Sequence, residues 1–138
     1  MEQTEKERWG FALEKRLHSH LQKLIGQDLV KTANQYDTID FEGKDYFVEL
    51  KGRPRIGFES KKYQDSKSFP SYLVPACKVL GADKKHVVVF YYFEGDNTLW
   101  KCHYTYKWFN FNKGFPAAST QYHFWVPKKC WTQVECPC

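Results

Sequence analysis

The run HVVVFYYF, from His86 to Phe93, is the feature that most constrains the fold, because every residue after the histidine is apolar or aromatic. A strand with one face in water alternates polar and apolar residues, whereas a strand that is covered on both faces does not. The run is also far too short to span a bilayer, so no membrane partner is expected. We therefore expect a central strand in a sheet that is covered on both faces.

A helical pattern precedes the sheet, from Thr4 to Gly26. Apolar residues recur there at spacings of three and four, as on one face of a helix; they are Trp9, Leu13, Leu17, Leu21 and Leu24. Thr4 is a suitable N-cap with Glu7 three residues later, and Gly26 is a suitable end. The pattern predicts one amphipathic helix.

Shorter patterns complete the predicted fold. A weak strand pattern lies within residues 27–32, a hairpin at 36–51, a strand at 98–104, and shorter strand patterns at 121–126 and 130–135. A second helix is expected near Ser71–Leu80. This order predicts an α/β fold of the mixed α+β kind, in which helices flank a central mixed β-sheet. We expect a single domain over residues 1–138, with a core at about 4–108 and peripheral strands and a tail at 109–138.

The composition excludes a disordered chain, because 42% of the residues are hydrophobic and 18% are aromatic. The N-terminal MEQTEKERWG is charged and lacks the apolar segment of a secretory signal, so an intracellular and not a secreted protein is expected. In a reducing compartment the five cysteines are expected to be thiols. Cys130, Cys136 and Cys138 lack the paired spacing of zinc ligands, and a zinc site there is an alternative to thiols in a tail.

Positive charge is concentrated between residues 51 and 67, in a chain whose net charge is +5. Six basic residues there face only two acids, Glu59 and Asp65; the basic residues are Lys51, Arg53, Arg55, Lys61, Lys62 and Lys67. Such an excess favours a polyanionic partner, because each cation near a phosphate releases condensed counterions. An ordinary solvated loop is the alternative.

The tripeptide Glu-x-Lys occurs three times, but only Glu49-Leu50-Lys51 lies on a predicted strand. Side chains two residues apart on a strand point to the same face. Glu49 and Lys51 are therefore expected on one face, with Val48 and Leu50 in the core on the other.

The other strand of the hairpin, at 36–41, carries Asp37 and Asp40. A loop of three residues would pair Phe41 with Asp45 and set Asp37 opposite Glu49. A loop of two or four residues would shift the register and bring Asp40 to that face instead. We favour Asp37, because it is farther from the turn and suits a pocket in the middle of the sheet.

Two carboxylates on neighbouring strands provide the hard oxygen ligands that suit Mg²⁺ or Mn²⁺. A lysine beside them can position a water molecule or offset charge that develops on a phosphate. A lysine is equally the counter-ion that makes two adjacent acids tolerable without a metal. Both interpretations are open at this point.

The order of these features resembles the PD-(D/E)XK nuclease superfamily, which includes restriction endonucleases, Holliday-junction resolvases and many small viral and phage nucleases. The resemblance consists of a helix, an acid on a strand, the sequence VELK after a short turn, a basic segment and a further helix, over about residues 7–93. It implies a restriction-endonuclease-like fold. Tyr36 stands before Asp37, where the family motif has a proline.

The resemblance also implies roles for the site residues. Asp37 and Glu49 would bind the metal, with the backbone carbonyl of Leu50 as a further ligand. Lys51 would assist the attack of water on the phosphodiester.

Many members of the family supply another glutamate from the first helix, and Glu14 is our candidate. At about 100° per residue it falls at the margin of the apolar stripe, near Gly10, which leaves room for a close approach. Glu7, one heptad earlier, is the alternative. A helix glutamate that pairs with a nearby lysine in solvent is a further possibility.

The sequence thus predicts a metal-dependent endo- or exonuclease that uses Mg²⁺ or Mn²⁺. DNA is favoured over RNA through the resemblance alone, which also allows a homodimer and, for a viral protein, the host cytoplasm or nucleus. Residues expected to hold the nucleic acid are Arg53, Arg55, Lys61, Lys62, Gln64 and Lys78. The alternatives are an inactive nucleic-acid-binding module of the same fold and a protein-interaction or structural protein.

Overall fold

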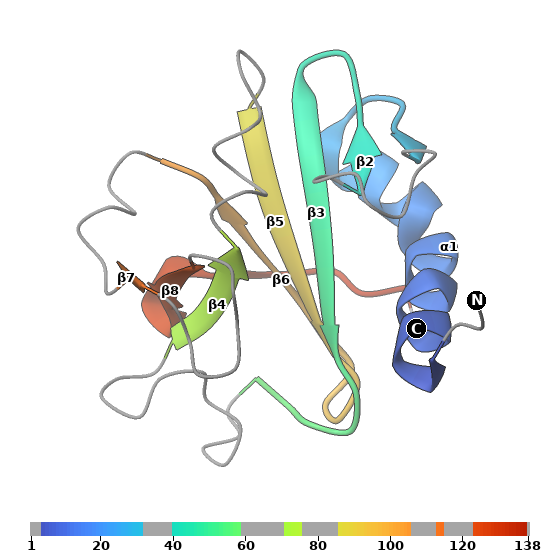
Figure 1. The fold of residues 1–138 in the computed structure, drawn as a ribbon. Coiled ribbons are helices and arrows are strands. Elements are labelled where there is room, and N and C mark those ends of the chain that lie inside the picture. The colour runs from blue at the N-terminus through green and yellow to red at the C-terminus, as the bar shows by residue number, and fades with distance from the viewer. Residues whose placement is uncertain are drawn as a thin grey trace.

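The computed structural model describes residues 4–31, 40–58, 71–75, 86–105, 113–114 and 123–137. Within these ranges a six-stranded sheet lies between one long helix and a three-stranded sheet (Figure 1). The helix is α1 (Glu5–Ile25), and a 3₁₀ turn, η3 (Lys128–Cys130), precedes the last strand. The mixed sheet that the sequence predicts is confirmed.

The large sheet has the strand order β1-β2-β3-β5-β6-β9. Its members are β1 (Val30–Lys31), β2 (Phe41–Glu42), β3 (Tyr46–Arg53), β5 (His86–Phe93), β6 (Thr98–His103) and β9 (Thr132–Val134). Neighbouring strands are antiparallel except β3 and β5, which run parallel from the pair Tyr46–His86 to the pair Arg53–Phe93. The small sheet has the order β4 (Ser71–Pro75), β8 (His123–Pro127), β7 (Lys113–Gly114).

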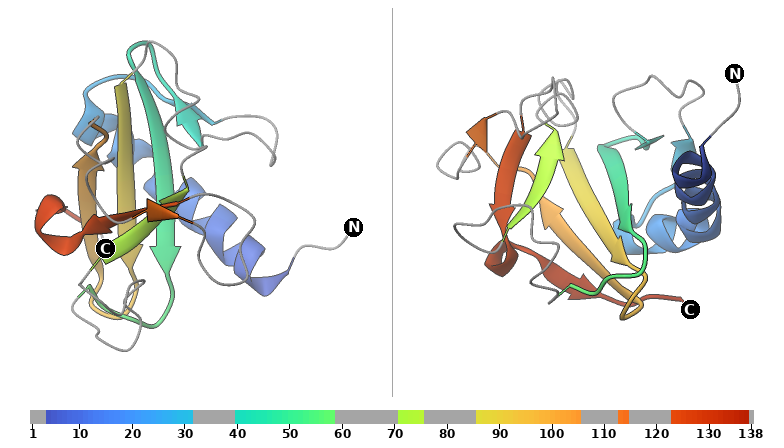
Figure 2. Two further views of the ribbon diagram at one scale, coloured as in Figure 1. Left: turned by 60° about the vertical axis from the view of Figure 1, so that its left-hand side comes forward. Right: turned by 60° about the horizontal axis from the view of Figure 1, so that its bottom comes forward.

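Strand β5 is covered on both faces, as its apolar run predicts. Val88, Phe90 and Tyr92 belong to the core beneath α1. The alternate residues from Val87 to Phe93 belong to a second core that also contains Val126 of β8. Figure 2 shows α1 and the small sheet on opposite sides of the large sheet. The two cores meet at β5, which fixes the strand at the centre of the molecule.

Helix α1 has the predicted bounds because both of its ends are capped. The Thr4 hydroxyl accepts a hydrogen bond from the Glu7 N–H at 3.1 Å. Gly26 adopts a left-handed φ of +83° and donates to the Gln22 carbonyl at 2.8 Å. The helix approaches β3 closely at Gly52, where an added Cβ would lie 2.5 Å from the Trp9 ring.

The predicted helix at Ser71–Leu80 is wrong over its first half. Ser71–Pro75 forms strand β4, which pairs antiparallel with β8. Tyr, Leu and Val between two prolines suit an extended segment, and a partner strand from the far end of the chain stabilises it. Residues 76–80 lie outside the described residues.

The hairpin of β2 and β3 has a different register from the one we favoured. Phe41 pairs with Val48 and not with Asp45. The Gly43 N–H donates to the Tyr46 carbonyl at 2.8 Å, which leaves a turn of two residues. Continuing this register by one residue places Asp40 opposite Glu49.

The cause of this register is a tertiary contact at the turn. The Gln27 side chain accepts from the Asp45 N–H at 2.9 Å and donates to the Asp45 carboxylate at 3.2 Å. An added Cβ at Gly43 would lie 2.4 Å from the same Gln27 oxygen, so a larger residue there would displace this side chain. The loop after α1 is therefore hydrogen-bonded to the turn and fixes which residues of β2 and β3 pair.

Candidate functional site

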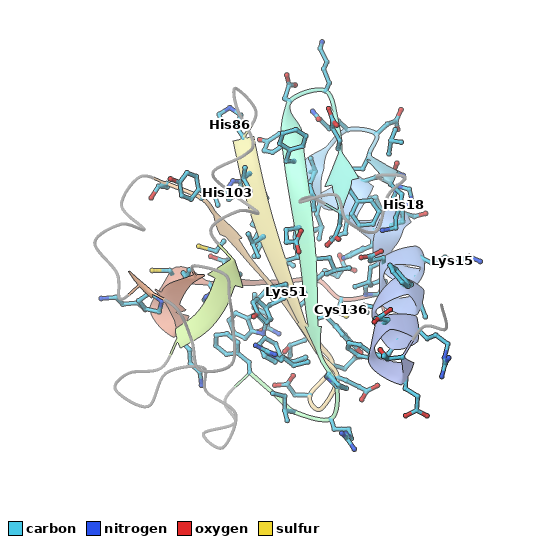
Figure 3. The ribbon with its side chains drawn as sticks, in the orientation of Figure 1. Lys15, His18, Lys51, His86, His103 and Cys136 are labelled. Carbon is cyan, nitrogen blue, oxygen red and sulfur yellow. The ribbon has the colours of Figure 1, made fainter. Side chains whose placement is uncertain are left out.

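The two faces of β3 are as the Glu-x-Lys spacing predicts. Val48 and Leu50 lie in the core beneath α1. Glu49 and Lys51 therefore project to the opposite face, where their partners on β5 are Val89 and Tyr91. Glu49 is only 4% exposed, and Lys51, which is labelled in Figure 3, is half-buried.

The backbone pairing of β2 with β3 ends at Phe41. Beyond this point, the edge of β3 that faces β2 is hydrogen-bonded by a side chain. The Leu50 N–H donates to the Asp40 carboxylate at 2.8 Å. In a strand, the N–H and C=O of one residue point to the same side. The Leu50 carbonyl and the Asp40 carboxylate are thus oxygen donors at the same edge.

Glu14 reaches Asp40 from α1. Its side chain is 11% exposed, and it interacts with Asp40 and forms an ion pair with the Lys31 ammonium. Glu7, the alternative, is exposed in the first turn of the helix. The structure therefore brings together Glu14, Asp40 and Lys31.

Burial raises the pKa of the Glu14 carboxyl from its ordinary 4.5 to about 7. The Lys31 ammonium opposes this rise, and the Asp40 carboxylate adds to it. Among the described residues, the Lys31 ammonium is thus paired with Glu14 beside a second carboxylate, Asp40. A divalent cation would compensate the charge of the two carboxylates more fully.

Lys31 was not predicted from the sequence. It lies on β1, and its ammonium is 5.7 Å from the centre of the Phe11 ring and 5.6 Å from that of Phe41. A lysine on a two-residue strand looks like an ordinary solvated residue. In the sequence, only the weak strand pattern after α1, together with Glu14, could have indicated that Lys31 reaches this site.

The arginines at the end of β3 differ in their surroundings. Arg53 lies over the Tyr91 ring and donates to its hydroxyl at 3.3 Å. Arg55 is exposed, with a left-handed φ of +68°, and its N–H donates to the Glu94 carboxylate at 2.9 Å. Arg55 also borders a hollow of about 570 Å³, which is lined by Glu5, Arg8, Trp9, Pro54, Arg55 and Glu94.

Several predicted residues lie outside the described residues: Asp37, Lys61, Lys62, Gln64 and Lys78. Within the described ranges, no three His, Cys, Asp or Glu residues form a group that could hold a metal ion. Glu49 thus does not complete such a group with Glu14 and Asp40. Mg²⁺ is commonly bound through one or two carboxylates with several waters. The carboxylates of Glu14 and Asp40, together with the Leu50 carbonyl, therefore fit such an ion.

The zinc alternative finds no support in the cysteines that the structure describes. Cys130 packs against the core on the face of the large sheet away from α1. Cys136 packs against the core beneath α1. These two thiols therefore lie on opposite faces of the sheet, and Cys138 lies outside the described residues.

Comparisons with known proteins add no family. Protein-family models, curated proteins and solved structures were each searched, and none matches this chain. In the part of the chain that the structure describes, no helix combines the length and the apolarity needed to span a membrane.

Proposed function

We propose that this protein is a metal-dependent nuclease that hydrolyses phosphodiester bonds, with DNA favoured over RNA through the resemblance to PD-(D/E)XK nucleases. The observation that carries the proposal is the meeting of Glu14, Asp40 and the Leu50 backbone at the edge of the Glu-x-Lys strand. These residues come from α1, from the position just before β2, and from β3, and the resemblance expects its acids on a first helix and on the two strands of a hairpin.

The strand arrangement supports a restriction-endonuclease-like fold as part of the proposal. Antiparallel β1, β2 and β3 follow α1, and β5 then joins β3 in parallel. Parallel neighbours need a long crossover connection. Residues 54–85 provide that connection here, and they contain much of the basic segment.

In this proposal Asp40, Glu14 and the Leu50 carbonyl hold Mg²⁺ or Mn²⁺, and the charge of Glu49, on the opposite face of β3, adds to the negative potential near the ion. Asp40 takes the role first given to Asp37, because the hairpin register sets Asp40 opposite Glu49. When bound, the ion would lower the pKa of a coordinated water and offset the charge of the phosphate.

The basic residues of β3 would act on the substrate directly. Lys51 shares the face of Glu49, where its ammonium can orient the attacking water or neutralise a non-bridging oxygen. Arg53 and Arg55 continue the chain from this position and would contact the backbone phosphates. Lys61 and Lys62 follow in sequence and keep their proposed role in holding the substrate.

The test is cleavage of duplex, branched and single-stranded DNA and of RNA, with Mg²⁺ or Mn²⁺ and with EDTA. Asp40→Asn and Lys51→Ala should each lower the rate about 1,000-fold. The matched controls are Asp28→Asn and Lys44→Ala, which change exposed residues of the same types.

Metal-dependent cleavage that both site variants lose, and that both controls keep, supports the proposal. The nuclease proposal fails if no substrate is cut, or if the two site variants cut as fast as the wild type. Salt-sensitive binding without turnover would instead identify an inactive nucleic-acid-binding module.

A further inference from the structure

Lys31 is the cation that the structure places on the proposed metal ligands. Its ammonium contacts the carboxylate of the buried residue Glu14. On the strand ladder Lys31 pairs with Phe41, the residue next to Asp40. One positive charge thus lies at a pair of carboxylates, where the proposed function requires a divalent ion.

The surroundings of Lys31 allow its side chain to leave this position. The side chain is 42% exposed, so part of it already lies in solvent. The rings of Phe11 and Phe41 flank the ammonium and favour it electrostatically without enclosing it. A lysine has a flexible four-carbon stem and a strongly hydrated head, so it can move away while β1 stays paired.

We propose that Lys31 occupies the cation position of the metal-free protein and is displaced from Glu14 when a divalent ion binds. This inference rests on the proposed function, because it uses the same ligands. An ammonium and a divalent ion at the same oxygens would repel each other, so their binding is competitive. Lys31 therefore stabilises the metal-free protein and lowers its affinity for metal.

The competition predicts effects of opposite sign for a single substitution. Lys31→Met retains an unbranched side chain beside the two rings but removes the charge. The metal-free variant should have a lower Tm than the wild type, because the buried Glu14 carboxylate loses its counter-ion. Its affinity for Mn²⁺ should rise about tenfold, because no ammonium has to be displaced.

The experiment is a Mn²⁺ titration of the full chain by calorimetry, with melting curves in EDTA and in saturating Mn²⁺. Lys15→Met is the matched control, because it removes the same charge from an exposed lysine that points away from the sheet (Figure 3). This control should bind Mn²⁺ like the wild type. Mn²⁺ should raise the Tm of Lys31→Met more than that of the wild type.

A second variant covers the case in which Lys31→Met does not fold. Lys31→Arg keeps the charge and offers a guanidinium that can bind a carboxylate with two hydrogen bonds. It should compete more strongly and bind Mn²⁺ several-fold more weakly than the wild type.

The outcomes separate this inference from the proposed function. Tighter binding by Lys31→Met, or weaker binding by Lys31→Arg, supports the displacement of Lys31. Unchanged affinity in both variants overturns the inference but leaves the metal site and the nuclease proposal intact. If no variant binds Mn²⁺, the inference is overturned, and the cleavage assay decides the nuclease proposal separately.

Discussion

Strands β3 and β5 lie side by side in parallel for eight residues, yet their patterns of polar and apolar residues differ. Every residue of β5 after His86 is buried and apolar or aromatic. Strand β3 has Val48 and Leu50 in the core beneath α1 but carries Glu49, Lys51 and Arg53 on its other face. Packing alone would favour apolar residues at those three positions, because their partners on β5 are Val89, Tyr91 and Phe93.

The difference between the two strands indicates where side chains are placed at a cost to stability. Burying a carboxylate such as Glu49 costs free energy that an apolar residue would not cost. Polar groups in such positions are typical of functional sites. The polar face of β3 is therefore the first place to perturb.

Glu49→Gln should have the largest effect, because it removes the charge of the buried carboxylate while keeping its shape. We expect cleavage to fall about 1,000-fold with little change in Tm. The measurements are the cleavage rate with Mg²⁺ and a melting curve. Glu42→Gln, at an exposed position on β2, is the control and should cleave normally. A variant that melts far below the wild type but keeps its activity would assign Glu49 to structure.

The apolar face of β3 should respond in stability and not in chemistry. Gly52→Ala would place a Cβ 2.5 Å from the Trp9 ring, so α1 would have to shift. We expect a loss of about 1–3 kcal/mol in the free energy of unfolding, measured with urea. Gly10→Ala is the control, because nothing lies within 4 Å of its added Cβ. It should stabilise the helix by roughly 0.5–1 kcal/mol. Equal effects of the two substitutions would contradict the close packing.

Glu14 should make stability depend on pH in the metal-free protein. Its carboxyl ionises near pH 4.5 in the unfolded chain and near pH 7 in the folded protein. Between these values the folded state binds more protons, so its stability falls as the pH rises and levels off above pH 7.

The measurement for Glu14 is the free energy of unfolding in EDTA at several pH values. The stability of the wild type minus that of Glu14→Gln should fall between pH 4.5 and 7. Glu7→Gln, which changes an exposed glutamate of the same helix, should show no such trend. A difference that is independent of pH would mean that Glu14 ionises normally.

Arg55 should have the smallest effect. Arg55→Gln removes one exposed cation beyond β3, and we expect a modest loss of affinity for DNA with a salt dependence that falls by about one ion. Binding measured at several salt concentrations gives this slope. Lys23→Gln, an exposed change in the last turn of α1, should leave the slope unchanged. The same slope for both variants would remove Arg55 from the interface.

The sequence predicted those features that depend on local chemistry. Thr4 and Gly26 bound the helix because capping involves only nearby residues. The run at β5 and the alternation in β3 set which side chains are buried. The resemblance made a glutamate of the first helix a candidate, the margin of the apolar stripe favoured Glu14, and the structure places Glu14 beside Asp40.

Features that depend on distant contacts were not predictable from the sequence. The hairpin register follows from the grip of Gln27 on Asp45, which no local pattern reveals, so Asp37 was preferred to Asp40. Strand β4 was predicted as helix because its partner β8 lies about fifty residues away along the chain. Lys31 became a candidate only when the fold brought β1 to Glu14.

The hydrogen bonds of Gln27 to the hairpin turn also constrain insertions and deletions in α1 and in the hairpin. Among their contacts with the hairpin, helix α1 and the loop after it reach its turn through Gln27 and Asp40 through Glu14. The distance along α1 and the loop after it, from Glu14 to Gln27, therefore has to match the distance along the hairpin from Asp40 to the turn. An insertion or deletion in either segment would separate the acids unless the other segment changed by a matching length, so the two must evolve together.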